Sequence, residues 1–420
     1  MPTLQNLTKK LNLNRFEPGV WAAAGIQSLG YIGYSTSFTY LPLYYYQERG
    51  LSMTLVGLLL LIPGAVAACT QVLGGMMADR FGYRRIVVLF KSAGIIASAV
   101  LAVLISLKAP LWSVVLMAIL VPALDGMAGP SILAIVADVS PKNRMTESYG
   151  LMAIAGNIDW AIGPFLGGFL LKFVSYGWLF GIGTFLSVFA LTCIPFLPAG
   201  HKTGDSERLS INSLKLLVSN STLVIFSLLS LLFFLTMSQW GSTLSVFTVD
   251  RIGFSTEQYG LLMSLSGILI VVFQYPVTRQ IQRLGTRKAL VFGSILYAVG
   301  FLSFTWVKTP LPAVGSIIIL VTGEMLFVPT AFSVVGQISR PEERGKTMGF
   351  YQLFNMLGMF SGPLLGGFLL DQFPKTPLFV WLPISLCSFI AALGFAVWRG
   401  YSETKTIDDI KPPVPLSFPT

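Results

Sequence analysis

The sequence is poor in the side chains that metal binding and acid–base catalysis most often use. Its 420 residues include one histidine, His201, and three cysteines, Cys69, Cys193 and Cys387. The histidine falls in a polar central stretch, so no imidazole is available for a proton relay inside an apolar segment. The cysteines fall within apolar segments, where we expect them to pack as small residues and not to form a disulfide framework. A metal-spaced Cys/His cluster and a G-x-x-x-x-G-K-[ST] nucleotide loop are also missing, which argues against an enzyme, a metal site, a cofactor and ATP as the energy source.

Charged residues are equally scarce. They make up 11% of the chain, hydrophobic residues make up 54%, and the mean hydropathy is +0.74. These values lie outside the range of soluble globular domains. Apolar runs of about twenty residues, each long enough to cross a bilayer, recur along the chain. We therefore predict an all-α membrane protein with twelve transmembrane helices, centred near Leu29, Val66, Ala97, Ala123, Gly156, Val188, Leu235, Ile268, Leu296, Glu324, Gly358 and Phe389.

The formal net charge of +10 follows the predicted membrane topology. Most lysines and arginines alternate, loop by loop, to one side of the predicted bilayer, as the positive-inside rule requires of cytoplasmic loops. We expect both termini in the cytoplasm, a location in the cell (inner or plasma) membrane, and no nucleic-acid partner. No cleavable signal peptide is expected, because the first apolar stretch is too long for one. The basic residues left on the opposite side are Arg49, Lys108, Lys172, Arg251, Lys308 and Lys375.

An internal repeat divides the chain into two halves. Gly-Pro-Phe-Leu-Gly-Gly-Phe-Leu-Leu at 163–171 returns as Gly-Pro-Leu-Leu-Gly-Gly-Phe-Leu-Leu at 362–370. Asp125 and Glu324 keep the same offset of 199 (324−125). This pattern predicts two pseudo-twofold-related six-helix bundles with a working site at their seam. The expected boundaries are residues 1–199 for the first bundle, 200–213 for a cytoplasmic linker, 214–400 for the second bundle, and 401–420 for a disordered cytoplasmic tail.

The segment between the second and third predicted helices resembles the signature loop of the major facilitator superfamily, G-x-x-x-D-R-x-G-x-R-[RK]. A degenerate second copy follows 203 residues later (282−79). The resemblance covers nearly the whole chain and implies a transporter in which this loop latches the cytoplasmic ends of the bundles. The alternative is that its arginines only anchor to anionic headgroups. The motif residues are Gly75, Asp79, Arg80, Gly82, Arg84 and Arg85.

The repeated Gly-Pro segment resembles a motif of the drug:proton antiporter branch of that superfamily, which includes LmrP- and MdtG-like multidrug exporters. Asp159 and Pro122 depart from the branch pattern, which has glycine and arginine at these positions. Close packing and a helix kink are expected, and packing without a role in transport is the alternative. The motif residues are Gly163, Pro164, Gly167 and Gly168, with Gly362, Pro363, Gly366 and Gly367 in the second half.

Three acidic residues, Asp125, Asp159 and Glu324, fall well inside predicted helices. A carboxylate at that depth costs about 2.5–3.5 kcal/mol, and removal from water favours its neutral form, so proton coupling is expected. Gly323-Glu324-Met325 with Pro329 resembles the tenth helix of LmrP-type exporters and proton-coupled oligopeptide transporters, where the glutamate faces the cavity. We therefore expect Glu324 to be the principal coupling residue. A hydrogen-bonded structural acid is the alternative. Lys91 could pair with an acid, but we expect it to reach the cytoplasmic interface.

Aromatic and amide side chains near the predicted helix centres form a candidate cavity lining. Aromatic residues at this spacing also occur in ordinary helix packing, so both interpretations stay open. The candidates are Gln27, Tyr31, Tyr34, Phe38, Asn157, Gln239, Trp240, Tyr351, Phe354 and Asn355.

Taken together, these features indicate a proton-coupled secondary transporter that works by alternating access. We expect a monomeric exporter of hydrophobic or amphipathic compounds, neutral or cationic because the cavity acids lack basic partners, with protons and the lipid bilayer as further partners. Uptake of a sugar, peptide or other metabolite by proton symport, or lipid flipping, are alternatives within transport. A non-transporting membrane sensor or a membrane-embedded enzyme is the alternative of another class.

Overall fold

The computed structural model describes residues 16–141, 145–198, 220–339 and 344–398. The predicted linker 200–213 and tail 401–420 lie outside these residues. The described residues form helices without strands, which confirms the predicted all-α class. Ten of these helices are long and apolar enough to cross a membrane, and α2 and α7 complete the predicted set of twelve.

The first bundle contains six long helical segments, and the first and last of them are extended by irregular turns. α2 continues into the short α3 and a π-helical turn at Tyr44–Glu48, and α8 continues into a 3₁₀ segment at Phe189–Phe196. The helices are α2 (Pro18–Phe38), α3 (Leu41–Leu43), α4 (Met53–Phe81), α5 (Tyr83–Ser106), α6 (Leu111–Val139), α7 (Met145–Leu170) and α8 (Tyr176–Val188).

The second bundle repeats this order. α10 breaks at a 3₁₀ turn, Ser238–Trp240, before α11 and a π-helical turn at Phe247–Ile252, and α13 ends in a 3₁₀ turn at Phe304–Trp306. The helices are α10 (Ser221–Met237), α11 (Thr243–Val246), α12 (Thr256–Leu284), α13 (Thr286–Ser303), α14 (Pro310–Ile338), α15 (Arg344–Gln372) and α16 (Pro377–Val397).

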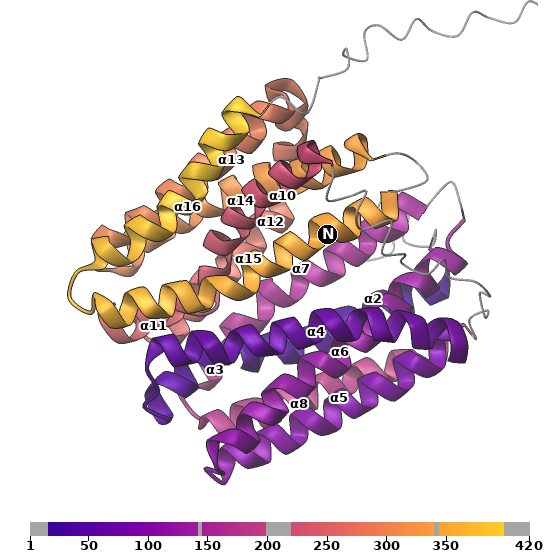
Figure 1. Ribbon diagram of the computed structural model, residues 1–420. Helices are drawn as coiled ribbons and strands as arrows, with labels where there is room; N and C mark the ends of the chain where they lie inside the picture. Colours follow the sequence, from indigo (N-terminus) through magenta and orange to yellow (C-terminus); the bar gives the residue numbers. More distant parts are fainter. Residues whose placement is uncertain (1–15, 142–144, 199–219, 340–343, 399–420) are drawn as a thin grey trace, which may run out of the picture.

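The two bundles lie side by side, with the seam between α4 and α7 on one side and α12 and α15 on the other (Figure 1). α4 packs on α15 and α7 packs on α12, so the second contact is the counterpart of the first under the repeat. α5 and α8 lie at the far edge of the first bundle, and α13 and α16 lie at the far edge of the second. The seam is therefore where a site shared by both bundles has to lie.

Two glycine turns mark the same end of both bundles. Gly82, between α4 and α5, has φ 91°, and Gly285, between α12 and α13, has φ 85°. Residues with a Cβ rarely adopt this backbone region, so a glycine is favoured at both tight turns. The turns carry the basic loops that the topology analysis places in the cytoplasm, and we call this end the basic end.

The repeated Gly-Pro motif brings helices into backbone contact. At Gly163 and Gly167, a Cβ would collide with α2 at Ser35 and Thr36, and at Gly168 it would collide with the main chain of Thr256 in α12. Gly362, Gly366 and Gly367 have the same relation to Ser238, Thr243 and Met53. The first copy thus brings α7 against α2 of its own bundle and against α12 of the other bundle. The second copy brings α15 against the broken segment after α10 and against α4 of the other bundle. Pro164 and Pro363 lie inside their helices, as expected.

Contacts between the bundles gather at the end away from the glycine turns. Tyr40 donates its hydroxyl to the carbonyl of Pro164 at 2.5 Å, and also lies 3.4 Å from the carbonyl of Thr256 in the other bundle. Thr256 in turn donates to the carbonyl of Gly168 at 3.1 Å. These contacts hold the seam closed at what the topology analysis predicts to be the outer end.

Candidate substrate cavity

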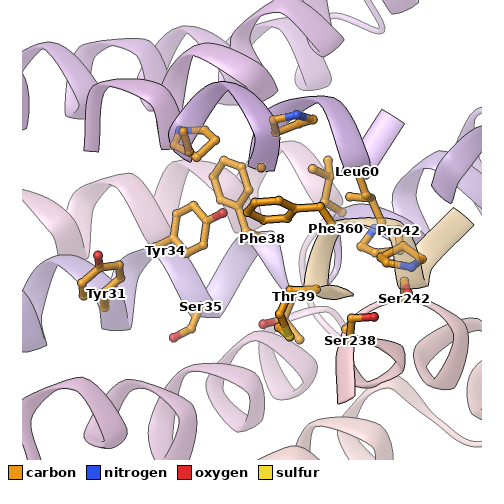
Figure 2. A pocket seen from close by; sticks show the side chains of 18 of the residues that line it. Tyr31, Tyr34, Ser35, Phe38, Thr39, Pro42, Leu60, Ser238, Ser242 and Phe360 are labelled. Carbon is orange, nitrogen blue, oxygen red and sulfur yellow. The ribbon is translucent and has the colours of Figure 1, made fainter. Parts of the chain in front are cut away.

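A cavity of about 570 Å³ lies at the seam, a volume within the range of small-molecule sites. α2 and the short α3 that follows it supply one wall, and α4, α6, α7, α15 and the broken segment after α10 supply the rest. Figure 2 shows Tyr31, Tyr34 and Phe38 along α2, with Phe360 of α15 close to Phe38. The lining is largely apolar and aromatic, which suits a hydrophobic or amphipathic compound.

The wall on α2 is an ordered row of rings. Tyr34 stacks on Phe38 with ring centroids 4.1 Å apart, and Tyr31 meets Tyr34 edge to face at 6.5 Å. The spacing of these residues on one helical face produces the row, because positions three and four apart lie above one another. Gln27 continues the same wall, so four of the predicted lining residues lie in the cavity wall together.

The other predicted lining residues do not border this cavity. Gln239 is fully buried and donates hydrogen bonds to the carbonyls of Leu235 and Gly362, both at 2.9 Å. Trp240 donates its indole N–H to Tyr297. Tyr351 is fully buried between Phe226 and Phe332. Outside the cavity lining lie Gln239, Trp240, Asn157, Tyr351, Phe354 and Asn355.

The dense aromatic core of the second bundle explains this difference. Phe233 stacks on Phe327 with centroids 3.7 Å apart, and Trp381 is fully buried against Phe301 and Phe304. Aromatic residues on these helices fill the bundle interior. Ser238, Gly241 and Ser242, small residues beside Gln239 and Trp240, border the cavity in their place. In the sequence, the small residues on either side of Gln239 and Trp240 are the signal that could have indicated this part of the lining.

Asp159 is the acid in the cavity wall. It lies on α7, is 5% exposed, and its Oδ1 has no hydrogen-bond partner among the described residues. Ser35 of α2 donates to the main-chain carbonyl of Asp159 at 3.1 Å, so this contact fixes the helix and does not involve the carboxyl group. A buried carboxyl group beside aromatic rings can bind either a proton or a cation.

Asp125 has a basic partner, contrary to the sequence interpretation. Lys91 of α5 forms an ion pair with Asp125 of α6, and the lysine is 7% exposed. Its ammonium group also lies 5.2 Å from the ring centroid of Tyr31. The expectation that Lys91 reaches the membrane interface is therefore wrong, because α5 turns this side chain toward α2 and α6. Asp125 is also not the uncompensated acid that the cargo argument assumed.

Glu324 lies elsewhere. It is half-buried on α14, follows a glycine that packs against the main chain of α13, and does not border the 570 Å³ cavity. It forms no ion pair with any residue that the structure describes. The three intramembrane acids thus have three environments: the cavity wall for Asp159, an ion pair for Asp125, and the second bundle for Glu324.

The predicted gating loop is described only in part. The Arg80 guanidinium lies 5.3 Å from the ring centroid of Phe81 and is exposed, and Gly82 forms the turn described above. The side chain of Asp79 is outside the described residues, so the latch that depends on it stays a prediction. Gly75 lies within α4, and Arg84 and Arg85 lie in the first turn of α5. No cluster of histidine, cysteine and acidic residues in the described ranges could hold a metal.

The sequence is similar to transporters of one superfamily. The sequence matches the family profile of the Major Facilitator Superfamily over residues 23–259 and 229–417. It is 26% identical to the uncharacterized MFS-type transporter YttB of Bacillus subtilis (strain 168), over 83% of this chain and 87% of that protein. It is 22% identical to the quinolone resistance protein NorA of Staphylococcus aureus (strain MSSA476), over 86% of this chain and 92% of that one.

Solved structures share the fold. A POT family transporter in complex with a thioalcohol-conjugated peptide superposes with a TM-score of 0.73 at 15% identity, over 90% of this chain and 95% of that one. The nucleoside transporter NupG superposes with a TM-score of 0.75 at 16% identity, over 91% and 99%.

Proposed function

The chain belongs to the Major Facilitator Superfamily and is a multi-pass membrane transporter, and we propose that it is a proton-coupled exporter of hydrophobic or amphipathic compounds, neutral or singly cationic. The observation that carries the proposal is the buried carboxyl group of Asp159 in an aromatic cavity at the seam between the bundles, where its Oδ1 has no hydrogen-bond partner among the described residues. Similarity to a quinolone resistance protein over most of both chains supports export.

The cavity chemistry supports this class of cargo. Tyr34, Phe38 and Phe360 offer ring faces that attract both apolar groups and cations. Asp159 supplies a negative charge when it is ionised, and the cavity lining in the described part of the chain includes no arginine or lysine. An anionic cargo would lack a fixed partner there and would lose its hydration without compensation.

Proton coupling follows from competition at one carboxyl group. With a cation in the cavity, Asp159 is stabilised in its ionised form, and with a proton bound it no longer attracts the cation. Because the bundles rock about the seam, the same group meets each side of the membrane in turn. Glu324 is the second candidate coupling residue, and a proton on it would act from within the second bundle.

The decisive experiment is transport by purified protein in proteoliposomes under an imposed pH gradient. A lipophilic cation on the side opposite to the proton excess should move against its own gradient and exchange for protons. Asp159→Asn keeps the size and hydrogen bonding of the side chain but fixes it neutral, so it should abolish uphill movement while downhill exchange of neutral cargo continues. Glu324→Gln, tested in parallel, shows whether the second acid is also required.

The direction of the response decides between export and uptake. Accumulation of cargo together with protons would identify a symporter and refute the export proposal. Uphill transport by Asp159→Asn at the wild-type rate would remove Asp159 from the coupling step. Each variant is compared with wild type for its thermal unfolding, so that lost transport is not confused with lost folding.

A further inference from the structure

The Lys91–Asp125 ion pair lies outside the substrate cavity but next to it. The pair borders a second cavity of about 40 Å³, together with Ser98 of α5 and Ser187 of α8. A water molecule needs roughly 10–15 Å³ of such volume, so this polar chamber has room for water. Nothing in the proposed transport step uses the pair.

Tyr31 and Tyr34 separate the two cavities. Both residues line the 570 Å³ cavity and the 40 Å³ chamber. On the chamber side, the Tyr31 ring lies against the Lys91 ammonium. One layer of aromatic side chains therefore stands between a cargo in the large cavity and the ion pair. Any net charge on the pair acts on the cargo across a wall of low polarity, where charges interact more strongly than in water.

The pair is difficult to explain by stability alone. The Lys91 side chain is 7% exposed and that of Asp125 is 27% exposed, so the lysine loses nearly all of its hydration and the aspartate loses part of it. Such a pair gains little over well-packed apolar side chains. The charge balance suggests a different role. Asp159 contributes one negative charge to the large cavity, and Lys91 cancels the negative charge of Asp125 behind the tyrosines. Without the lysine, two acids would act on the cargo.

We propose that Lys91 sets the charge selectivity of the substrate cavity. By neutralising Asp125, Lys91 leaves Asp159 as the single acid of the two cavities whose charge acts on the cargo, which restricts the site to neutral and singly charged cationic compounds. The inference rests on the proposed function only in taking the 570 Å³ cavity as the cargo site. It makes Lys91 a specificity-determining residue that need not touch the cargo.

The test uses two probe ions of similar shape and opposite charge, tetraphenylphosphonium and tetraphenylborate, with purified full-length protein. Asp125→Asn leaves Lys91 without a partner and adds one positive charge behind Tyr31. It should weaken binding of the phosphonium about fivefold and strengthen binding of the borate by a similar factor. The double variant Lys91→Met/Asp125→Asn has the net charge of the wild type, and it should bind both ions with wild-type affinity.

Opposite shifts for the two ions are what a merely structural pair would not produce. Equal losses for both ions in Asp125→Asn would overturn the inference, and so would a double variant that keeps the affinities of the single one. Should Asp125→Asn not fold, Lys91→Met measured at about pH 9 tests the same balance with the signs reversed.

The same binding measurements distinguish failure of the proposed cargo site from failure of the proposed role of Lys91. Binding in the cavity is identified by its loss in Phe38→Ala and Phe360→Ala. If wild-type protein binds neither ion there, the cargo site proposed above is wrong. If it binds the phosphonium there but the variants do not respond to charge, only the role of Lys91 is wrong.

Discussion

The carboxylate of Asp371, at the end of α15, accepts two hydrogen bonds from Thr54, at the start of α4 in the other bundle. The Thr54 hydroxyl donates at 2.6 Å and its backbone N–H donates at 2.7 Å to the same oxygen, Oδ2. The other oxygen, Oδ1, accepts from the backbone N–H of Met53 at 2.9 Å. Asp371 thus satisfies N–H groups at a helix N-terminus, where a negative charge is favoured, across the seam.

The repeat places a different contact at the related position of the other half. Asp371 corresponds to Lys172 (371−199), and Thr54 corresponds to Glu257 (54+203). Lys172 and Glu257 form an ion pair across the seam, with side chains 42% and 26% exposed. Two equivalent positions, related by the pseudo-twofold symmetry, are therefore joined in one case by a capping carboxylate and in the other by a partly exposed ion pair.

Asp371→Asn is expected to shift the protein toward conformations that are open at the outer end. The amide replaces charge-assisted hydrogen bonds with weaker ones, at a cost of roughly 1–3 kcal/mol. Distances between spin labels on the outer ends of α4 and α15 would report the shift. The matched control is Glu257→Gln, which removes an exposed ion pair worth about 0–1 kcal/mol and should change the distribution little. A larger response in the control would reverse this assignment.

Gly367→Ala is expected to hinder closure of the outer end. A Cβ at this position collides with the main chain of Met53 across the seam, and backbone atoms cannot move aside cheaply. Transport should fall at least about tenfold, which corresponds to roughly 1.4 kcal/mol, and the label distances should lengthen as they do for Asp371→Asn. Gly315→Ala is the control, because a Cβ there meets nothing within 4 Å. Normal transport by Gly367→Ala would show that the seam yields at this contact.

Gln239→Leu separates packing from cargo binding. Gln239 joins the break after α10 to Gly362 of α15 and does not border the cavity. Loss of its buried hydrogen bonds should lower the free energy of unfolding by about 1–3 kcal/mol, with the apparent affinity for cargo unchanged. Thermal unfolding and binding are measured on the same preparation. A weakened affinity at unchanged stability would place Gln239 in the cargo site after all.

The orientation in the membrane can be tested with single cysteines in the 200–213 loop, in a variant from which Cys69, Cys193 and Cys387 have been removed. The charge asymmetry predicts that this loop is cytoplasmic. Impermeant thiol reagents added outside intact cells should leave it unlabelled, whereas cysteines near Lys308 should react. Labelling of the loop from outside would contradict the predicted cytoplasmic location of this loop.

The sequence was sufficient for the architecture because each of its signals is local and occurs twice. The turns at Gly82 and Gly285 have the same backbone conformation, and each copy of the Gly-Pro motif makes the same two kinds of contact. Asp159 stands where the antiporter motif has glycine, and this residue lies in the cavity wall. The spacing of Tyr31, Tyr34 and Phe38 predicted the row of rings on α2, because one face of this helix lines the cavity.

The sequence did not predict the direction of several side chains. That direction depends on the rotation of each helix about its own axis, which an apolar sequence specifies poorly. α5 is surrounded by lipid on one side and helices on the other, and both surfaces favour apolar residues, so the direction of Lys91 could not be read from its neighbours. The same ambiguity affected Trp240 and Tyr351, because an aromatic ring fills a bundle interior as readily as it lines a cavity. Only the packed structure distinguishes these two environments.

The polarity of α2 has a consequence for how the protein is made. This helix carries Gln27, Tyr31 and Tyr34 in the cavity wall, together with a series of small residues. It is not among the ten helices apolar enough to span a membrane by composition. It is nevertheless synthesised before α7 and α8, the helices on which it packs. Lipid alone offers it little stabilisation, since its favourable contacts are with helices that do not yet exist. We therefore expect α2 to become stable in the bilayer only after α7 and α8 have been synthesised, so that the helices of the first bundle insert together.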